Sequence, residues 1–403
     1  MICPGLINGT DYKNEIDVEF SDCISAIVLF DRSLKNPNSN TTYNDLKLNS
    51  NVYYLRDKIN KIKFDSKLYM HAVEIHKQIY LNGETFLISD RTFKFKLFKN
   101  NADYLVDILE IILTCISIVQ SEKPSHIVFV LRPHNLYFWI MKIVAEYFGV
   151  KILILEVSVL PKGVIILEGS EENLFAVEDK YQQLSDTSTH DILFDFSKLD
   201  VSKKQKIENQ KLSQKSVTKR ILSRVNKLPK KGLRPIVSIL YSELRASKIK
   251  KYISDIVVTD ISHFSEKKII TIFLHFQPES TTLPLGKDFN NQLAAILSIL
   301  SGLPKDWVLL IKEHPSTFSL EFSLTNNYRS VAFYEFIKLL PNCHMLPVSV
   351  SVGQVFEYSD CVATVSGTVG MQAIAVGKKV ITFSNVNYIA SKLVLNATDS
   401  TTP

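Results

Sequence analysis

Cysteine is scarce in this chain, and its distribution excludes two classes of protein. The 403 residues contain five cysteines, which is an odd number, and no two of them are separated by two or three residues. A disulfide-bonded secreted scaffold and a zinc knuckle both depend on paired cysteines. Neither class is therefore expected, and we predict a protein of a reducing compartment, the cytoplasm.

Long apolar segments and a leader pattern are absent as well. The longest apolar stretch, 105–119, spans 15 residues and contains Asp107 and Glu110. A helix that crosses a bilayer needs about 20 apolar residues. The first residues, Met1–Gly5, show no basic region followed by an apolar one, so we expect neither a signal peptide nor a membrane span.

Three patterns of nucleotide and metal chemistry are missing too. The chain has no Walker motif and no Gly-x-Gly-x-x-Gly dinucleotide pattern. It also lacks an Asp-x-Asp pair positioned to hold Mg²⁺. We therefore expect no cofactor and no metal.

Positive charge is concentrated in one segment. Residues 203–251, here called the basic segment, contain 16 lysines and arginines against two acids, whereas the remainder carries 31 basic and 39 acidic residues. Apolar residues recur in it at helical spacing: Val217, Ile221, Val225 and Leu228. This pattern favours docking on an anionic membrane surface, with a solvated linker as the alternative. Nucleic-acid binding is disfavoured, because Tyr241 is the segment's one aromatic residue for base stacking.

The order of predicted elements indicates two α/β domains. Buried-type strands are predicted at 26–30, 126–131, 150–155, 268–274, 307–312, 361–365 and 379–383, and helices at 105–119, 136–147, 290–300 and 371–376. Alternating strands and helices build doubly wound, Rossmann-like sheets. We predict an N-terminal domain at 1–198, a basic helical linker at 199–255 and a second domain at 256–403, with a ligand cleft between the two sheets.

The first candidate site follows the strand at 307–312. Lys312, which we predict to bind a phosphate, and His314 come at the carboxyl end of that strand, and Pro315 stops its continuation. A lone histidine is more often structural than functional. Beside a lysine at a strand end, however, His314 could donate a hydrogen bond to a phosphate oxygen, or a proton if its pKa lies near neutrality.

The second candidate site begins 51 residues after Pro315. The strand at 361–365 leads into the turn Ser366–Gly370 and then into a helix that Gly377 closes. Such a turn aims backbone N–H groups and the positive end of a helix dipole at an anion. We therefore predict phosphate binding by Ser366, Gly367, Thr368 and Gly370.

Carboxylates near strand ends are candidates for a general base. Glu279 follows the strand at 268–274, and Asp31 and Glu156 each follow a predicted strand of the first domain. Each could instead cap a backbone turn. The sequence does not choose among them.

Several of these segments together resemble the capsule polysaccharide biosynthesis family. The resemblance is carried by Phe276–Thr282, Lys312–Pro315, Ser366–Ala373, Gly377–Phe383 and Tyr388, and more weakly by Leu155–Pro161. That family consists of GT-B glycosyltransferases and is similar to the Kdo transferases and sialyltransferases that use a His-Pro motif. The resemblance implies that His314 and the turn 366–370 contact the phosphates of a nucleotide-sugar donor, CMP- or UDP-linked.

The resemblance also implies an activity. It implies sugar transfer to a capsular or lipopolysaccharide-type glycan, which can be lipid-linked. Since the Asp-x-Asp pair is missing, we expect this transfer to need no metal, and the basic segment favours a position at the inner face of the membrane. Gln372 stands where the family usually has a glutamate, and its amide oxygen can still accept a hydrogen bond from a ribose. The chain ends 15 residues after Tyr388, so the second domain is expected to be abbreviated.

Two alternatives remain open at this point. A glycerophosphate or polyol-phosphate transferase of the teichoic type shares the two-domain architecture and a His-Pro element. A degenerate, non-catalytic nucleotide-sugar-binding protein is suggested by the uncharged Gln372.

Overall fold

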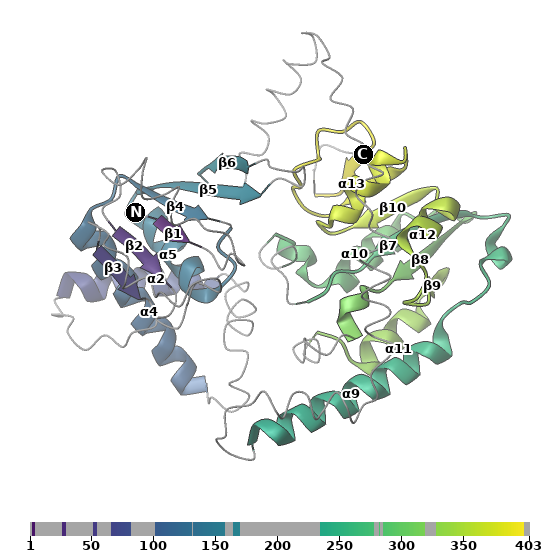
Figure 1. Ribbon diagram of the computed structural model, residues 1–403, viewed down its shortest axis with the longest axis horizontal. Helices are drawn as coiled ribbons and strands as arrows, with labels where there is room; N and C mark the ends of the chain where they lie inside the picture. The colour runs from purple at the N-terminus through teal and green to yellow at the C-terminus, as the bar shows by residue number, and fades with distance from the viewer. Residues whose placement is uncertain are drawn as a thin grey trace, which may run out of the picture. The chain divides into compact units, whose positions relative to one another are not determined.

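The chain forms two compact units, each of which holds a six-stranded sheet within its described residues (Figure 1). Unit 1 spans Met1–Ala176 and unit 2 spans Val177–Pro403. The computed structural model describes residues 2–4, 26–29, 51–54, 66–81, 101–130, 132–157, 164–169, 234–277, 282, 285–318 and 328–398.

The sheet of unit 1 has the strand order β3-β2-β1-β4-β5-β6. All neighbouring strands are parallel except β5 and β6, which pair antiparallel. The strands are β1 (Ile2–Pro4), β2 (Ala26–Leu29), β3 (Asn51–Tyr54), β4 (His126–Val130), β5 (Lys151–Val157) and β6 (Val164–Glu168). The helices described for this unit are α2 (Ser66–Leu81), α4 (Asn101–Glu122) and α5 (Leu136–Tyr147).

The sheet of unit 2 has the order β12-β11-β10-β7-β8-β9, and all neighbouring strands are parallel. The strands are β7 (Lys268–Phe273), β8 (Trp307–Lys312), β9 (Cys343–Met345), β10 (Cys361–Thr364), β11 (Lys379–Thr382) and β12 (Val394–Asn396). The helices are α9 (Arg234–Ile256), α10 (Gln292–Ser301), α11 (Val331–Leu339), α12 (Val352–Tyr358) and α13 (Thr368–Ala375), with 3₁₀ turns η5 (Ile261–Phe264), η6 (Lys287–Asn290) and η7 (Pro315–Phe318).

Helices cover both faces of this second sheet. On one face, Ile270 and Ile272 of β7 pack in a cluster with residues of α9, α10 and α11. On the other face, Ile269 and Phe273 of the same strand pack with residues of α12 and α13. Because successive strand residues point to opposite faces, a strand buried on both sides must be apolar throughout. This requirement explains the continuous apolar runs that the sequence shows at β7 and β8.

The predicted fold class is confirmed by this topology. Counted in chain order, each sheet has the 3-2-1-4-5-6 arrangement of the Rossmann fold. The predicted strands correspond to β2, β4, β5, β7, β8, β10 and β11, and the predicted helices to α4, α5, α10 and α13. The expectation that the two sheets face one GT-B cleft stays a prediction, since each unit is described by itself.

The segment 199–255, predicted as a linker, overlaps α9. The side chains of Ile249 and Ile253 near the end of that helix are buried in the core of unit 2. Residues 203–233, which make up most of the basic segment, lie outside the described residues. Among the helices of the described residues, none is long and apolar enough to cross a membrane.

Candidate functional site

The candidate site lies where the strand order of unit 2 reverses. β7 is flanked by β10 on one side and by β8 on the other. In open α/β sheets, ligands bind outside the carboxyl ends of the strands at such a reversal point. The two predicted motifs follow β8 and β10, so the carboxyl end of β7 lies between them.

His275, two residues beyond β7, holds the turn that follows β10. Its Nε2 atom lies 3.2 Å from the backbone N of Ser366 and 3.0 Å from the Thr364 hydroxyl oxygen. The same hydroxyl oxygen accepts the N–H of Gly367 at 3.1 Å. Burial lowers the pKa of His275 to about 3, with His314 and Arg329 acting in the same direction. The imidazole is therefore neutral at physiological pH.

Tyr388 closes over the other end of the turn. Its hydroxyl donates to the carbonyl of Gly367 at 2.6 Å. A Cβ atom added to Gly370 would overlap the Tyr388 hydroxyl and ring. A Cβ on Gly367 would lie 2.7 Å from the Thr364 hydroxyl. Neighbouring atoms therefore leave no room for a side chain at either position, which explains why both residues are glycine.

Gly370→Ala is expected to lower the free energy of unfolding of unit 2 by about 1–3 kcal/mol, because Tyr388 must move and the core there is already filled. In a Tyr388→Ala background the same substitution should instead stabilise by about 0.5–1 kcal/mol, the helix preference of alanine over glycine. Urea unfolding followed by tryptophan fluorescence measures these changes. The chain has two tryptophans, so a Trp139→Phe background leaves Trp307 of unit 2 as the reporter.

Gly353→Ala is the matched control for this cycle. Gly353 lies in α12, and nothing stands within 4 Å of the position of an added Cβ. The control should stabilise in both backgrounds. Equal effects of Gly370→Ala with and without the Tyr388 ring would contradict the steric explanation.

Lys312 is the last residue of β8, at the carboxyl end of the strand as predicted, but its ammonium binds a carbonyl of the protein itself. Its ammonium donates to the carbonyl of Val348 at 2.8 Å, and the residue is 2% exposed. Burial lowers the pKa of Lys312 to about 8, although Glu313 opposes the shift. The contact ties the loop after β9 to the end of β8. Its predicted contact with a phosphate stays a prediction.

Glu313 is the centre of a buried network behind the predicted site. Its carboxylate accepts from Arg329 Nε and from the Tyr334 hydroxyl, each at 2.7 Å, and from the N–H of His314 at 2.8 Å. Burial favours the neutral acid, yet Arg329 and these hydrogen bonds hold the pKa of Glu313 below its usual value. Glu313 therefore fixes the backbone at His314.

Arg329 extends this network to the end of β7. Its guanidinium donates to the Gln277 side chain at 3.0 Å and to the His275 carbonyl at 3.1 Å. Gln292 of α10 also binds the backbone of His275, accepting from its N–H at 2.7 Å and donating to its carbonyl at 3.1 Å. The backbone that follows β7 is thus clamped from two sides.

His314 is half-buried next to this network. Its ring lies 6.4 Å from that of Phe276, measured between centroids. Burial lowers the pKa of His314, with Lys312 and Arg329 adding to the shift and Glu313 opposing it. A neutral imidazole at physiological pH donates a hydrogen bond and does not supply a full positive charge. The predicted contact of His314 with a phosphate stays a prediction.

The remaining predicted site residues differ in where they lie. Ser366 and Gln372 are half-buried and Thr368 is exposed at the start of α13. Asp31 and Glu279 lie outside the described residues. Glu156 was expected just beyond a strand but lies inside β5, where it pairs with Ile165 of β6. Pairing with the antiparallel β6 extends β5 to Val157 and accounts for this difference.

Sequence reasoning missed His275 and Arg329. His275 follows a predicted strand as closely as His314 does, so the rule that singled out His314 would also have found it. Arg329 offers no such signal, because it lies 16 residues from Glu313 and at no strand end.

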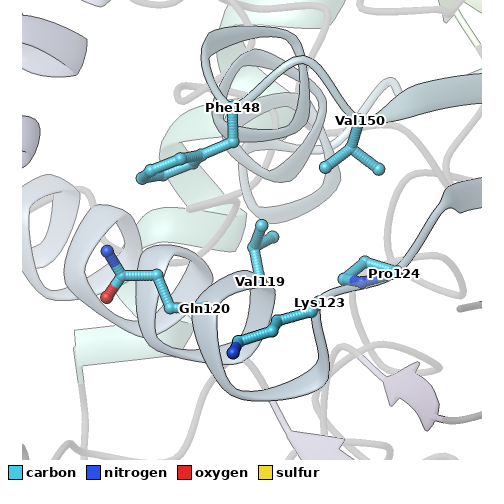
Figure 2. Close-up of a pocket in the computed structure, with 6 residues that line it drawn as sticks. All are labelled: Val119, Gln120, Lys123, Pro124, Phe148 and Val150. Carbon is cyan, nitrogen blue, oxygen red and sulfur yellow. The ribbon is translucent and has the colours of Figure 1, made fainter.

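A separate cavity of about 430 Å³ lies in unit 1. It is lined by Val119, Gln120, Lys123, Pro124, Phe148 and Val150. Figure 2 shows Phe148 and Val150 opposite Val119 and Pro124. These residues precede β4 and β5, so the cavity lies at the amino ends of the strands. It is therefore at the opposite edge from where Rossmann-like sheets bind ligands.

The fold and the site define a protein of two Rossmann-like units, with a glycine-containing strand-to-helix turn at the switch point of the second. No model of a known protein family matches the sequence, and no curated protein does. Among solved structures, the chain is similar to the beta Kdo 2,7 transferase KpsC of Thermosulfurimonas dismutans, at 13% identity over 70% of this chain and 73% of that chain, with a TM-score of 0.32.

Two further proteins are also among the similar structures. The UDP-GlcNAc 2-epimerase of Methanocaldococcus jannaschii shares 13% identity over 72% of this chain and 70% of that one, with a TM-score of 0.25. S. aureus MnaA, in a structure with UDP, shares 13% identity over 68% of this chain and 61% of that one, with a TM-score of 0.24. Likenesses of this size assign no family, so the proposal below rests on the chain's own residues.

Proposed function

We propose that this protein is a glycosyltransferase that moves a sugar from a nucleotide-sugar donor to a capsular or lipopolysaccharide-type glycan. One observation carries the proposal. The elements that follow β7, β8 and β10 are joined by His275, Glu313 and Arg329 at the strand reversal of a Rossmann-like sheet. A network this deeply buried holds a turn and a histidine in fixed positions, as binding of a phosphate group requires.

The chemistry assigned to this site is stabilisation of a leaving group. In sugar transfer, the bond between the anomeric carbon and a phosphate oxygen breaks while an acceptor hydroxyl attacks that carbon. Negative charge grows on the phosphate, and the His314 imidazole and the first turn of α13 are donors that can stabilise it. We assign no metal to this step. A carboxylate takes the acceptor proton, with Glu279, Asp31 and Glu156 as the candidates.

Replacement of both Ser366 and Thr368 by alanine tests donor binding. The double variant should bind UDP or CMP more weakly by about 1–3 kcal/mol, the range for hydrogen bonds lost to a charged group. Titration calorimetry with the wild type and the variant measures this difference. Ser298→Ala, an exposed serine of α10 whose hydroxyl bonds a helix carbonyl, is the matched control and should bind like the wild type.

The thermal stability of the same variants separates binding from folding. If the turn merely held the fold together, the double variant would melt at a lower temperature but bind each nucleotide as tightly as the wild type. That result would contradict the assignment of the turn to the donor phosphate.

Membrane docking through the basic segment is a second part of the proposal. Its charge and helically spaced apolar residues are those of a peripheral membrane anchor, and each lysine or arginine near an anionic surface contributes about 1 kcal/mol. Neutralising six of its lysines should abolish co-sedimentation with vesicles that contain an anionic lipid. Unchanged co-sedimentation would rule out this part.

A further inference from the structure

His275 connects the two motifs that the proposed function uses. It follows β7, which lies between β8 and β10 in the sheet. Its side chain contacts Thr364, the last residue of β10, and Ser366 just beyond that strand. Its carbonyl accepts from Arg329, which binds Glu313 beyond β8. His275 is 6% exposed.

The hydrogen bonds of His275 fix where its proton lies. A backbone N–H can only donate, so the Nε2 atom that receives the Ser366 N–H must carry a lone pair. The Thr364 hydroxyl therefore donates to the same Nε2, and its oxygen is left to accept the N–H of Gly367. The imidazole is the tautomer that carries its proton on Nδ1. Protonation of Nε2 would place two donors face to face and break this arrangement.

These bonds also determine which donors of the turn remain for a ligand. The N–H groups of Ser366 and Gly367 point inward to His275 and Thr364. The N–H groups of Thr368 and Val369, in the first turn of α13, have no carbonyl four residues earlier within the helix. Thr368 itself is exposed. Because the N–H groups of Ser366 and Gly367 are held by hydrogen bonds, the backbone that follows them, with the N–H groups of Thr368 and Val369, is held in one orientation.

We propose that His275, as a neutral imidazole, is a positioning residue that orients the 366–370 turn for the diphosphate or phosphate of the nucleotide donor. This inference rests on the proposed function. His275 does not touch the donor in this scheme. It acts through Ser366 and Thr364, and its backbone is held by Gln292 and Arg329 so that the ring has one position.

The test compares two substitutions of His275. His275→Gln keeps a hydrogen-bond acceptor at about the distance of Nε2, whereas His275→Leu keeps the bulk and removes the acceptor. Titration with UDP and CMP should show a loss of affinity of about tenfold for His275→Leu, and less than about threefold for His275→Gln. His263→Leu is the matched control, because His263 is exposed on η5 and its Nδ1 contacts the Asp260 carbonyl of its own turn.

Hydrogen exchange supplies a readout in the absence of any nucleotide. The amides of Ser366 and Gly367 should exchange faster in His275→Leu than in the wild type, while the amides of β8 keep their protection. A variant that merely destabilised unit 2 would lose protection throughout the sheet. His275→Gln should restore the slow exchange at both amides.

The outcomes separate the two proposals. If the wild type binds UDP or CMP and His275→Leu binds it equally well, the positioning role is wrong and the proposed function stands. If exchange at Ser366 and Gly367 is unchanged in His275→Leu, the positioning role is wrong as well. If the wild type binds neither nucleotide, the proposed function fails and this inference fails with it.

Discussion

Arg329→Met is expected to lower the free energy of unfolding of unit 2 by about 3–5 kcal/mol, the cost of leaving a buried charge without its partner. Glu313 is 0% exposed and Arg329 is 3% exposed. Their closest contact is 2.7 Å between Arg329 Nε and a carboxylate oxygen. Methionine fills similar space but offers no donor, so the carboxylate keeps only the Tyr334, Thr317 and His314 hydrogen bonds.

Urea unfolding in the Trp139→Phe background measures this loss through Trp307 of unit 2. Lys77→Met is the control, since Lys77 and Glu74 form an ion pair of the same 2.7 Å length on the surface of α2. Both side chains are more than half exposed there, and such pairs contribute less than about 1 kcal/mol. Because α2 belongs to unit 1, its unfolding is followed through Trp139 of α5 in a Trp307→Phe background. A loss below about 1 kcal/mol in Arg329→Met would show that the buried pair does not hold the carboxyl ends of β7 and β8 together.

The double variant Glu313→Leu with Arg329→Met distinguishes charge from packing. Removing both charges leaves no unpaired ion, and buried pairs replaced by apolar residues often lose little stability. The double variant should therefore recover most of the loss seen in Arg329→Met. If the losses from the two single substitutions instead add up in the double variant, the size and shape of the two side chains, rather than their charges, stabilise the carboxyl ends of β7 and β8.

His314→Ala is expected to reduce the rate of sugar transfer by about 100- to 1000-fold at saturating donor, the typical cost of one preorganised donor to a developing charge. Its effect on nucleotide affinity should be much smaller, because the proposed mechanism has the contribution of His314 grow in the transition state. Transfer or donor hydrolysis by the wild type and the variant, each with the same nucleotide sugar, measures both quantities.

His344→Ala is the matched histidine control. His344 is half-buried on β9, and its ring lies 4.9 Å from that of Phe264, measured between centroids. Phe264 precedes β7, so this contact is not at the carboxyl end of that strand. It should affect melting more than rate per folded molecule. Near-equal rates for wild type and His314→Ala would exclude the catalytic role. A wild type that binds donors but transfers none would favour the degenerate binding protein that Gln372 suggested.

The fold was predictable wherever one local signal sufficed. The run Trp307–Lys312 was predicted with the observed bounds, because a strand buried on both faces is apolar throughout. The helix ends near Gly149 and Gly377 were predictable too, and both residues have positive φ, 67° and 76°. In contrast, β9 has three residues and left no pattern long enough to detect.

One missed helix did carry a signal. Ser351 and Gln354 form a capping box at the start of α12, with reciprocal hydrogen bonds between side chain and backbone. The spacing Ser-x-x-Gln before an apolar run is the recognised sequence pattern of this cap. The helix was therefore predictable from the residues.

The candidate site was predictable in position but not in its internal contacts. A strand end followed by a histidine or a glycine turn predicted that both motifs lie at the carboxyl ends of strands, and they follow β8 and β10. The partners of Lys312 and Glu313 come from residues 36 and 16 positions away along the chain. Such pairings depend on how loops return to the sheet, and no spacing rule within one segment encodes them.

The packing of α9 determines where unit 2 can be divided from the rest of the chain. A protein fragment that starts at residue 256, the predicted boundary, would lack Ile249 and Ile253, which are 3% and 4% exposed in the intact chain. Each buried isoleucine contributes about 1.5–3 kcal/mol. Their loss would uncover apolar side chains of the sheet and of α11, and such a fragment should aggregate. A fragment that begins ahead of Arg234 keeps that surface covered.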